Sequence, residues 1–250
     1  MTGNQGADVA AGAALGAGAA AADIVAGGYG QDHERVQVIQ EAITYSRRFS
    51  GSWFVVHASQ SSVEPASVSQ DLLMLRSLGI NVAVVAGESG RRHPGALAVD
   101  LRKALNRDDL TAVELSWEET RSCDVPWRQQ RRWQQIGESG SLIVVVQCSA
   151  ESSLRAALTL AVECCAAKLL LLEEDWDPAR LPVGGPGAPA PSADIVRPYL
   201  ATLGSPAAVI AVEATEAGIS EVHILPTRGN AHPILLEIFT DSGIGTWIGA

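Results

Sequence analysis

Residues 221–248 read EVHILPTRGNAHPILLEIFTDSGIGTWI, and this stretch decides the fold. Its first apolar run, Val222 to Leu225, predicts a short buried strand followed by a turn. Pro233 suits the first turn of a helix, so the apolar residues after it predict a helix. The glycine-punctuated end of the stretch predicts a final strand. A strand, a helix and a second strand in such close succession indicate a chain that layers helices on a sheet.

The same alternation runs through the rest of the chain. Apolar runs predict strands over residues 52–57, 81–86, 111–115, 142–147 and 168–172. Helical spacing of apolar residues and capping residues predict helices over residues 33–49, 67–78, 96–105, 126–136, 149–165 and 206–217. We therefore expect an α/β protein, a three-layer αβα sandwich around a mainly parallel sheet. The sequence contains no internal repeat and no apolar run of transmembrane length.

Two of the predicted helices begin at specific polar residues. Ser67 and Gln70 have the spacing of a capping box, which predicts a helix start at Ser67. Ser205 and Pro206 predict an N-cap and a first helical residue, and Gly218 predicts the end of that helix.

Composition divides the chain into three kinds of segment. Residues 1–31 are dominated by Ala and Gly, whose small side chains bury too little area to offset chain entropy, so we expect a flexible tail. Residues 32–250 are expected to form a single domain. Within it, residues 181–193 are rich in Pro and Gly, which predicts a mobile surface loop.

Charge and cysteine content limit the possible partners and the compartment. The 250 residues include 18 Lys and Arg against 28 Asp and Glu, a net charge of −10 that disfavours nucleic acid and anionic membranes as partners. No basic segment precedes the apolar residues of the N-terminus, so we expect no secretory signal.

The four cysteines, Cys123, Cys148, Cys164 and Cys165, lack the spacing of a metal site or a disulfide framework. Buried free thiols in a reducing compartment are the favoured interpretation, and we expect a cytoplasmic protein.

The C-terminal stretch resembles a known family. His223-Ile-Leu, followed by Ile-Leu-Leu-Glu-Ile-Phe-Thr-Asp-x-Gly-Ile-Gly-Thr ending at Thr246, is similar to the ending of N-acetylglutamate kinases and of the kinase-like half of N-acetylglutamate synthases. Both belong to the amino acid kinase family. Residues 45–51 and 75–81 resemble the family's N-terminal helix ending and the lead into its second strand. The resemblance covers roughly residues 33–248 and implies an amino acid kinase (carbamate kinase-like) fold.

The positions that match the family's catalytic motifs carry other residue types. The family's two lysines, its glycine runs and its Asn and Asp at a helix start are replaced or eroded at His57, Ser59, Gln60, Gly87, Glu88, Ser152, Leu154 and Ala207. Phosphoryl transfer depends on cations and backbone NH groups around the moving charge. The resemblance therefore implies a chain whose kinase activity is lost, with Mg-ATP as cofactor only if activity is retained. The five histidines have no metal-ligand spacing, so no metal site is predicted.

A second set of family positions is retained. Arginine-inhibited members bind arginine through positions that correspond here to Tyr45, His223, Glu237 and Gly243. By resemblance, Glu237 would pair with the guanidinium in bidentate fashion and backbone groups near Gly243 would complete the fork. The alternative is structural, with Glu237 a solvated or capping carboxylate, His223 a core histidine and Tyr45 simple packing.

Other constellations carry weaker signals. Residues 87–90 and 137–140 both read Gly-Glu-Ser-Gly, which is not the nucleophile elbow of serine hydrolases, and the second copy is typical of a tight turn. The helix over residues 126–136 combines Arg128, Arg131 and Arg132 with two tryptophans. It is either a solvated face anchored by Trp127 and Trp133 or a site for a phosphate or a partner.

These observations favour a non-catalytic N-acetylglutamate kinase-like subunit of arginine biosynthesis, regulatory, arginine-binding or assembly-forming. One alternative is an active acetylglutamate kinase that uses ATP and N-acetyl-L-glutamate to form N-acetylglutamyl 5-phosphate. Another is the detached kinase-like half of an N-acetylglutamate synthase, in which case we expect no acetyl transfer by this chain alone. The expected partners are arginine or N-acetylglutamate and either further copies of the chain or an active family member. The helix over residues 33–49 is the predicted interface.

Overall fold

The computed structural model describes residues 40, 42–59, 63–88, 96–106, 111–116, 126–138, 142–181, 192–239 and 243–249. The chain forms two compact units, Met1–Tyr45 and Ser46–Ala250, and each is described by itself. In the first, residues 40 and 42–45 are helical, and Thr44 Oγ1 donates a hydrogen bond to the carbonyl of Gln40 at 2.8 Å. The predicted tail over residues 1–31 and most of the predicted loop over residues 181–193 lie outside the described residues.

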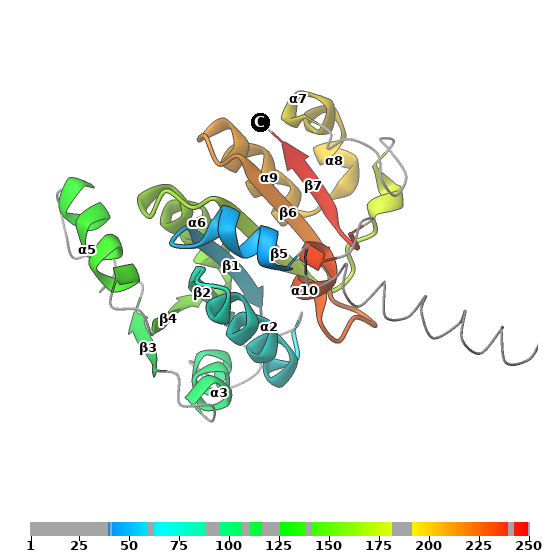
Figure 1. Cartoon of the computed structure of the whole chain (residues 1–250). Helices are drawn as coiled ribbons and strands as arrows, with labels where there is room; N and C mark the ends of the chain where they lie inside the picture. The colour runs from blue at the N-terminus through cyan, green and yellow to red at the C-terminus, as the bar shows by residue number, and fades with distance from the viewer. Residues whose placement is uncertain are drawn as a thin grey trace, which may run out of the picture. The chain divides into compact units, whose positions relative to one another are not determined.

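The second unit is built on a seven-stranded sheet (Figure 1). Its strands are β1 (Trp53–Ser59), β2 (Asn81–Glu88), β3 (Thr111–Ser116), β4 (Leu142–Ser149), β5 (Lys168–Glu173), β6 (Glu221–Pro226) and β7 (Thr246–Gly249). Their order is β3-β4-β2-β1-β5-β6-β7. Every pairing is parallel except that of β6 with β7, which is antiparallel. The predicted mainly parallel α/β fold is confirmed.

Helices cover both faces of this sheet (Figure 1). One face packs against α2 (Pro65–Ser77), α3 (Ala96–Leu105) and α10 (Pro233–Phe239). The other packs against α6 (Ala150–Glu163) and α9 (Pro206–Glu216), with α5 (Pro126–Glu138) against α6. The short helices α7 (Ala193–Val196) and α8 (Leu200–Leu203) and the 3-10 turns η2 (Pro178–Arg180) and η3 (Arg197–Tyr199) occupy segments where no helix was predicted.

The central strands are buried because both faces of the sheet are covered. In β1 every residue from Trp53 to Ala58 is at most 6% exposed, and Lys168 to Leu172 of β5 are similarly buried. Continuous apolar runs of this kind are typical of parallel sheets between helices. No helix in the described ranges is long and apolar enough to cross a membrane.

The start of α2 differs from the prediction. The helix begins at Pro65, with Glu64 as an N-cap that makes no side-chain capping bond, so Ser67 lies inside the first turn and the predicted capping box is wrong. Proline prefers the first helical position because its φ is already helical and it has no amide hydrogen to satisfy. The predicted start of α9 is confirmed, because Ser205 Oγ accepts a hydrogen bond from the amide of Ala208 at 3.3 Å.

Candidate functional site

The carboxyl ends of β1, β2 and β4 meet at one edge of the sheet. Ser59 pairs in register with Gly87, and Gly87 pairs with Cys148. Because α6 begins directly after β4, its first turn lies at the same edge and carries Ser152 and Leu154. The fold therefore brings together most of the positions that the sequence matched to the family's catalytic motifs. In parallel α/β sheets this edge is where ligands usually bind.

His57 is the central side chain of this edge. It is 3% exposed, and its Nε2 is hydrogen-bonded to Ser153 Oγ at 2.9 Å. Burial lowers the pKa of His57 to about 4, so the imidazole is neutral at physiological pH. Its Nδ1 has no hydrogen-bond partner in the described part of the chain. A buried neutral ring thus occupies the position where the family resemblance calls for a cation.

Gly87 packs directly against this pair. A Cβ atom added to Gly87 would lie 2.6 Å from Ser153 Oγ and 3.5 Å from His57 Nε2. Only a residue without a side chain fits between β2 and α6 at this point. The retained glycine therefore has a packing role.

The remaining catalytic-motif positions are filled by hydroxyl and apolar groups. Ser152 Oγ contacts Ser149 Oγ at 2.6 Å and Cys148 Sγ at 3.1 Å, which ties its hydroxyl to the end of β4. Leu154 packs against the hydrophobic core, and Ala207, at the start of α9, is fully buried in it. Gln60 and the side chain of Glu88 lie outside the described residues.

Three of the four predicted effector residues form a second cluster, on β6, α10 and the segment before β7. Glu237 Oε1 is hydrogen-bonded to His223 Nδ1 at 2.8 Å. Glu237 Oε2 accepts from the amides of Ile244 and Gly245, each at 2.8 Å. A Cβ on Gly243, whose φ is +58°, would lie 2.8 Å from the same oxygen. Tyr45, the fourth predicted residue, belongs to the first unit.

The Glu237 carboxylate is buried and ionised. Burial raises its pKa, but the hydrogen bonds from His223 and the amides of Gly245 and Ile244 outweigh burial and hold the pKa below its usual range. A carboxylate offers about four acceptor positions, of which three are used here. One position on Oε1 is left, so a bidentate guanidinium fork would have to displace an existing partner, whereas a single hydrogen bond would not.

Glu221 extends the cluster at the start of β6. Its carboxylate pairs with the buried Lys168 and, at 2.9 Å, with Arg48 Nη2. His223 Nε2 lies 3.9 Å from Glu221 Oε2 and has no hydrogen-bond partner within the described ranges. Burial raises the pKa of Glu221, yet His223 and the two cations outweigh it and hold the pKa at about 2. Trp247, 44% exposed, stacks on the His223 ring with centroids 6.1 Å apart.

Comparisons with known proteins agree with this arrangement. No family model matches the chain. A segment of 58 residues is 41% identical to the acetylglutamate kinase of Pelobacter propionicus, and covers 22% of this chain and 20% of that enzyme. The acetylglutamate kinases of Trichlorobacter lovleyi and Geobacter metallireducens match over 58 residues at 40% identity. The match thus spans about one fifth of the length of these relatives.

Two solved structures share the fold. The N-acetylglutamate synthase of Neisseria gonorrhoeae, solved with coenzyme A and N-acetylglutamate, superposes with a TM-score of 0.64 at 20% identity over 86% of this chain and 63% of the synthase. The UMP kinase of Ureaplasma parvum superposes with a TM-score of 0.58 at 12% identity over 80% of this chain and 99% of the kinase. The chain therefore resembles acetylglutamate kinases over one 58-residue segment and shares its fold with these two structures. Its predicted resemblance to the amino acid kinase family is confirmed.

The chain has only two lysines, Lys103 and Lys168. Lys103 is exposed in the last turn of α3. Lys168 is buried at the start of β5, where it pairs in register with Phe54 near the amino-terminal end of β1 and binds Glu221. Since His57 and Ser59 lie toward the other end of β1, neither lysine lies at the carboxyl edge.

Two polar residues near these sites, Ser153 and Asp71, were not predicted from the sequence. Ser153 gives no signal beyond a hydroxyl in a predicted helix. Asp71 is fully buried in α2 and binds the amides of Ile234 and Leu235, at 3.0 and 3.4 Å, as well as His232 Nδ1 at 2.8 Å. It caps the start of α10. The signal available in the sequence was the acidic residue Asp71 beside the apolar residues of α2.

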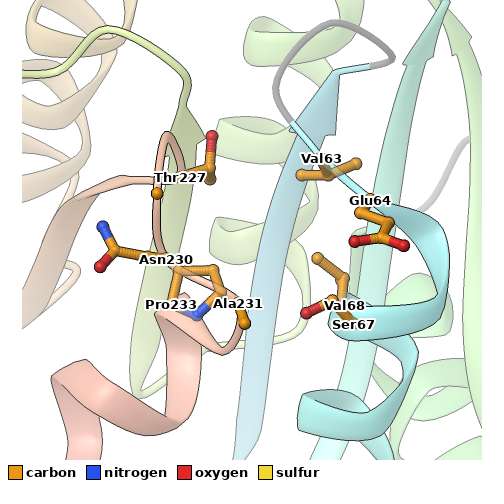
Figure 2. Close-up of a pocket in the computed structure, with 9 residues that line it drawn as sticks. Val63, Glu64, Ser67, Val68, Thr227, Asn230, Ala231 and Pro233 are labelled. Carbon is orange, nitrogen blue, oxygen red and sulfur yellow. The ribbon is translucent and has the colours of Figure 1, made fainter.

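A cavity of about 310 Å³ lies beside this capping contact. Figure 2 shows residues at the start of α2 facing the segment between β6 and α10 across it: Val63, Glu64, Ser67 and Val68 on one side, and Thr227, Asn230, Ala231 and Pro233 on the other. Ser67 Oγ is buried and has no hydrogen-bond partner among the described groups. The cavity is small and partly polar.

Proposed function

We propose that this chain is a catalytically silent acetylglutamate kinase-like domain that binds arginine and serves as a regulatory or assembly subunit in arginine biosynthesis. The observation that carries the proposal is the environment of His57. A buried, neutral imidazole bonded to Ser153 fills the end of β1, where a kinase of this family needs a positive charge. A neutral ring supplies no positive charge to offset the charge on a transferring phosphoryl group.

Among the described residues, the cations near the carboxyl edge are already paired with carboxylates: Arg228, just after β6, lies 3.1 Å from Glu174 and 2.8 Å from Asp175. Neither lysine lies there, and Arg155, in the second turn of α6, is held by Glu213 of α9, with Nη2 2.9 Å from Oε1. The apolar side chains of Leu154 and Ala207 supply neither a hydrogen-bond acceptor nor a charge. The loss therefore extends over several elements, which argues against a single compensating residue.

Arginine binding is supported by the second cluster. Glu237 Oε1 keeps one acceptor position, and the exposed ring of Trp247 stacks on its partner His223, so a guanidinium could gain one hydrogen bond and an aromatic face. The Glu221 carboxylate beside His223 is already paired with Lys168 and Arg48. The guanidinium would make one charge-assisted hydrogen bond to Glu237 in place of the bidentate fork. N-acetylglutamate is the other small molecule that relatives suggest, and it lacks the positive charge that the Glu237 carboxylate favours.

The proposal extends to assembly and location. The partners would be further copies of the chain or an active acetylglutamate kinase, joined through the helix predicted over residues 33–49, and deletion of residues 1–48 is then expected to lower the mass seen by light scattering. A cytoplasmic location would suit the reduced thiols of Cys148, Cys164 and Cys165. The first two thiols are buried as predicted, whereas Cys165 is exposed, because its φ of +52° turns the chain at the end of α6.

The test is a set of melting curves with arginine and with citrulline, which is nearly isosteric but uncharged. Arginine at a hundredfold excess over its dissociation constant is expected to stabilise the fold by about 2.7 kcal/mol. Glu237→Gln is expected to weaken arginine binding by about ten- to a hundredfold, since a charge-assisted hydrogen bond contributes roughly 1.5–3 kcal/mol. Asp71→Asn is the matched control, because it weakens the start of α10 without touching Glu237, and it should keep the full arginine response. Equal shifts with both ligands, or none with either, would refute arginine recognition.

A further inference from the structure

A cavity of about 560 Å³ lies at the opposite edge of the sheet from His57. Trp53 and Asn81, the first residues of β1 and β2, line it, and the carboxyl-terminal ends of α2, α5 and α6 contribute Arg76, Gly137 and Cys165. Cavities of this volume are in the range that holds small molecules. The cavity is separate from the clusters around His57 and Glu237, so a ligand bound in it would be independent of the proposed function.

Two residues that line this cavity each carry a buried N–H group without an acceptor. Trp133 is 1% exposed, and its Nε1 has no hydrogen-bond partner in the described part of the chain. The same holds for Nε of Arg76. Buried donors in folded proteins are nearly always paired, so two unpaired donors lining one cavity indicate a missing acceptor.

The guanidinium of Arg76 is held in place by neutral groups. Its Nη1 donates to the carbonyl of Ile80 at 3.1 Å and to Asn81 Oδ1 at 2.7 Å. Asn81 is itself fixed, because its Nδ2 donates to the carbonyl of Gly51 at 2.8 Å. Burial lowers the pKa of Arg76, and no carboxylate of the described residues pairs with it. An oxyanion would supply both the missing acceptor and a counter-charge.

The walls also indicate what the oxyanion is attached to. Trp53 and Trp133 meet edge to face with centroids 5.6 Å apart, so aromatic surface lines one side. α5 approaches closely because a Cβ on Gly137 would lie 2.7 Å from Asn81 Nδ2. Glu138 is the one carboxylate among the described lining residues, and it is exposed. Its negative charge disfavours a multiply charged ligand such as phosphate.

We infer that this cavity binds a small aromatic monocarboxylate, whose carboxylate accepts hydrogen bonds from Arg76 Nε and Trp133 Nε1 while its ring lies against the indoles. The interpretation of α5 as a basic face anchored by tryptophans is thereby extended, since Trp133 supplies an N–H to the site as well as an anchor.

Benzoate, benzamide and inorganic phosphate are the probes, and the readout is the NMR cross-peak of the Trp133 indole N–H, assigned by its absence in Trp133→Phe. Benzoate is expected to move this peak saturably, with benzamide and phosphate binding at least about tenfold more weakly. Arg76→Gln is expected to weaken benzoate by about tenfold or more. The exposed-cation control Lys103→Gln should bind benzoate like the parent.

Four results would overturn the inference. They are no saturable benzoate shift, benzamide binding as tightly as benzoate, phosphate binding more tightly than benzoate, and unchanged benzoate affinity in Arg76→Gln. If Arg76→Gln does not fold, Arg76→Lys takes its place, since it keeps the charge but removes the Nε donor, and the same tenfold loss is expected.

Discussion

Replacing Glu237 by glutamine removes the charge from a carboxylate that joins α10 to β6 and to the segment before β7. The side chain of Glu237 is 7% exposed, so solvent screens its interactions little. It accepts three hydrogen bonds at 2.8 Å, from His223 and from the amides of Ile244 and Gly245. Glutamine keeps one oxygen for the two amides but presents an NH₂ group to His223, and all three contacts lose the benefit of a charged partner.

The expected cost is a loss of about 3 kcal/mol in the free energy of unfolding. Hydrogen bonds to charged groups contribute roughly 1.5–3 kcal/mol each, and removing one partner of a buried pair costs about 3–5 kcal/mol. The lower end of the second range, about 3 kcal/mol, applies because glutamine retains one acceptor. Urea denaturation at pH 7 measures the change, and the slope of unfolding free energy against urea should stay that of the parent.

A matched control lies on α9. Glu213 accepts hydrogen bonds from a charged side chain, Arg155, but the side chains of Glu213 and Arg155 are 31% and 63% exposed. An exposed ion pair contributes about 0–1 kcal/mol, so Glu213→Gln should change stability by no more than that. If Glu237→Gln lies within about 0.5 kcal/mol of the parent, or costs no more than Glu213→Gln, then the Glu237 cluster does not hold the C-terminal segment.

Two further predictions concern the carboxyl edge. Gly87→Ala is expected to lower the free energy of unfolding by about 1–3 kcal/mol, because its Cβ would lie 2.6 Å from Ser153 Oγ. Urea denaturation should show this loss, and adding Ser153→Gly should restore most of the lost stability. The pKa of His57 is lowered from 6.5 to about 4, so between these values the unfolded chain binds the extra proton and stability falls as pH drops through this window. The loss is about 3 kcal/mol at most. The slope of unfolding free energy against pH between pH 6.5 and 5 should flatten in His57→Gln relative to the parent, and an unchanged slope would contradict the burial of a neutral ring.

The sheet was predictable because each central strand is an apolar run. β1, β4 and β5 lie in the interior of the sheet and are mostly apolar, with His57 as the polar residue within β1, and helices follow the strands at short intervals. The sequence pattern predicted a wrong helix start where two start signals lie close together. Both Pro65 and the Ser67 pair indicate a helix start, and the fixed φ of proline placed it at Pro65.

The candidate sites were only partly predictable because their decisive contacts join residues that are far apart in sequence. The motif positions located His57 and Glu237, but the partner of His57 is Ser153, 96 residues later, and Asp71 contacts the start of α10 more than 160 residues away. Nothing local marks either contact. The sequence also gave no sign that most acceptor positions of the Glu237 carboxylate are occupied, because only the fold brings the amides of Ile244 and Gly245 to it.

The central claim is that the carboxyl edge of this sheet has lost the positive charge that phosphoryl transfer requires. Its most direct test is a steady-state assay of the purified full chain with Mg-ATP and N-acetylglutamate, in which acyl phosphate is trapped with hydroxylamine and His57→Ala is run beside the parent. We predict product at the background rate in both proteins, with no difference between them. An ordinary enzymatic turnover of about 1–10³ s⁻¹ in the parent, abolished by His57→Ala, would contradict the claim.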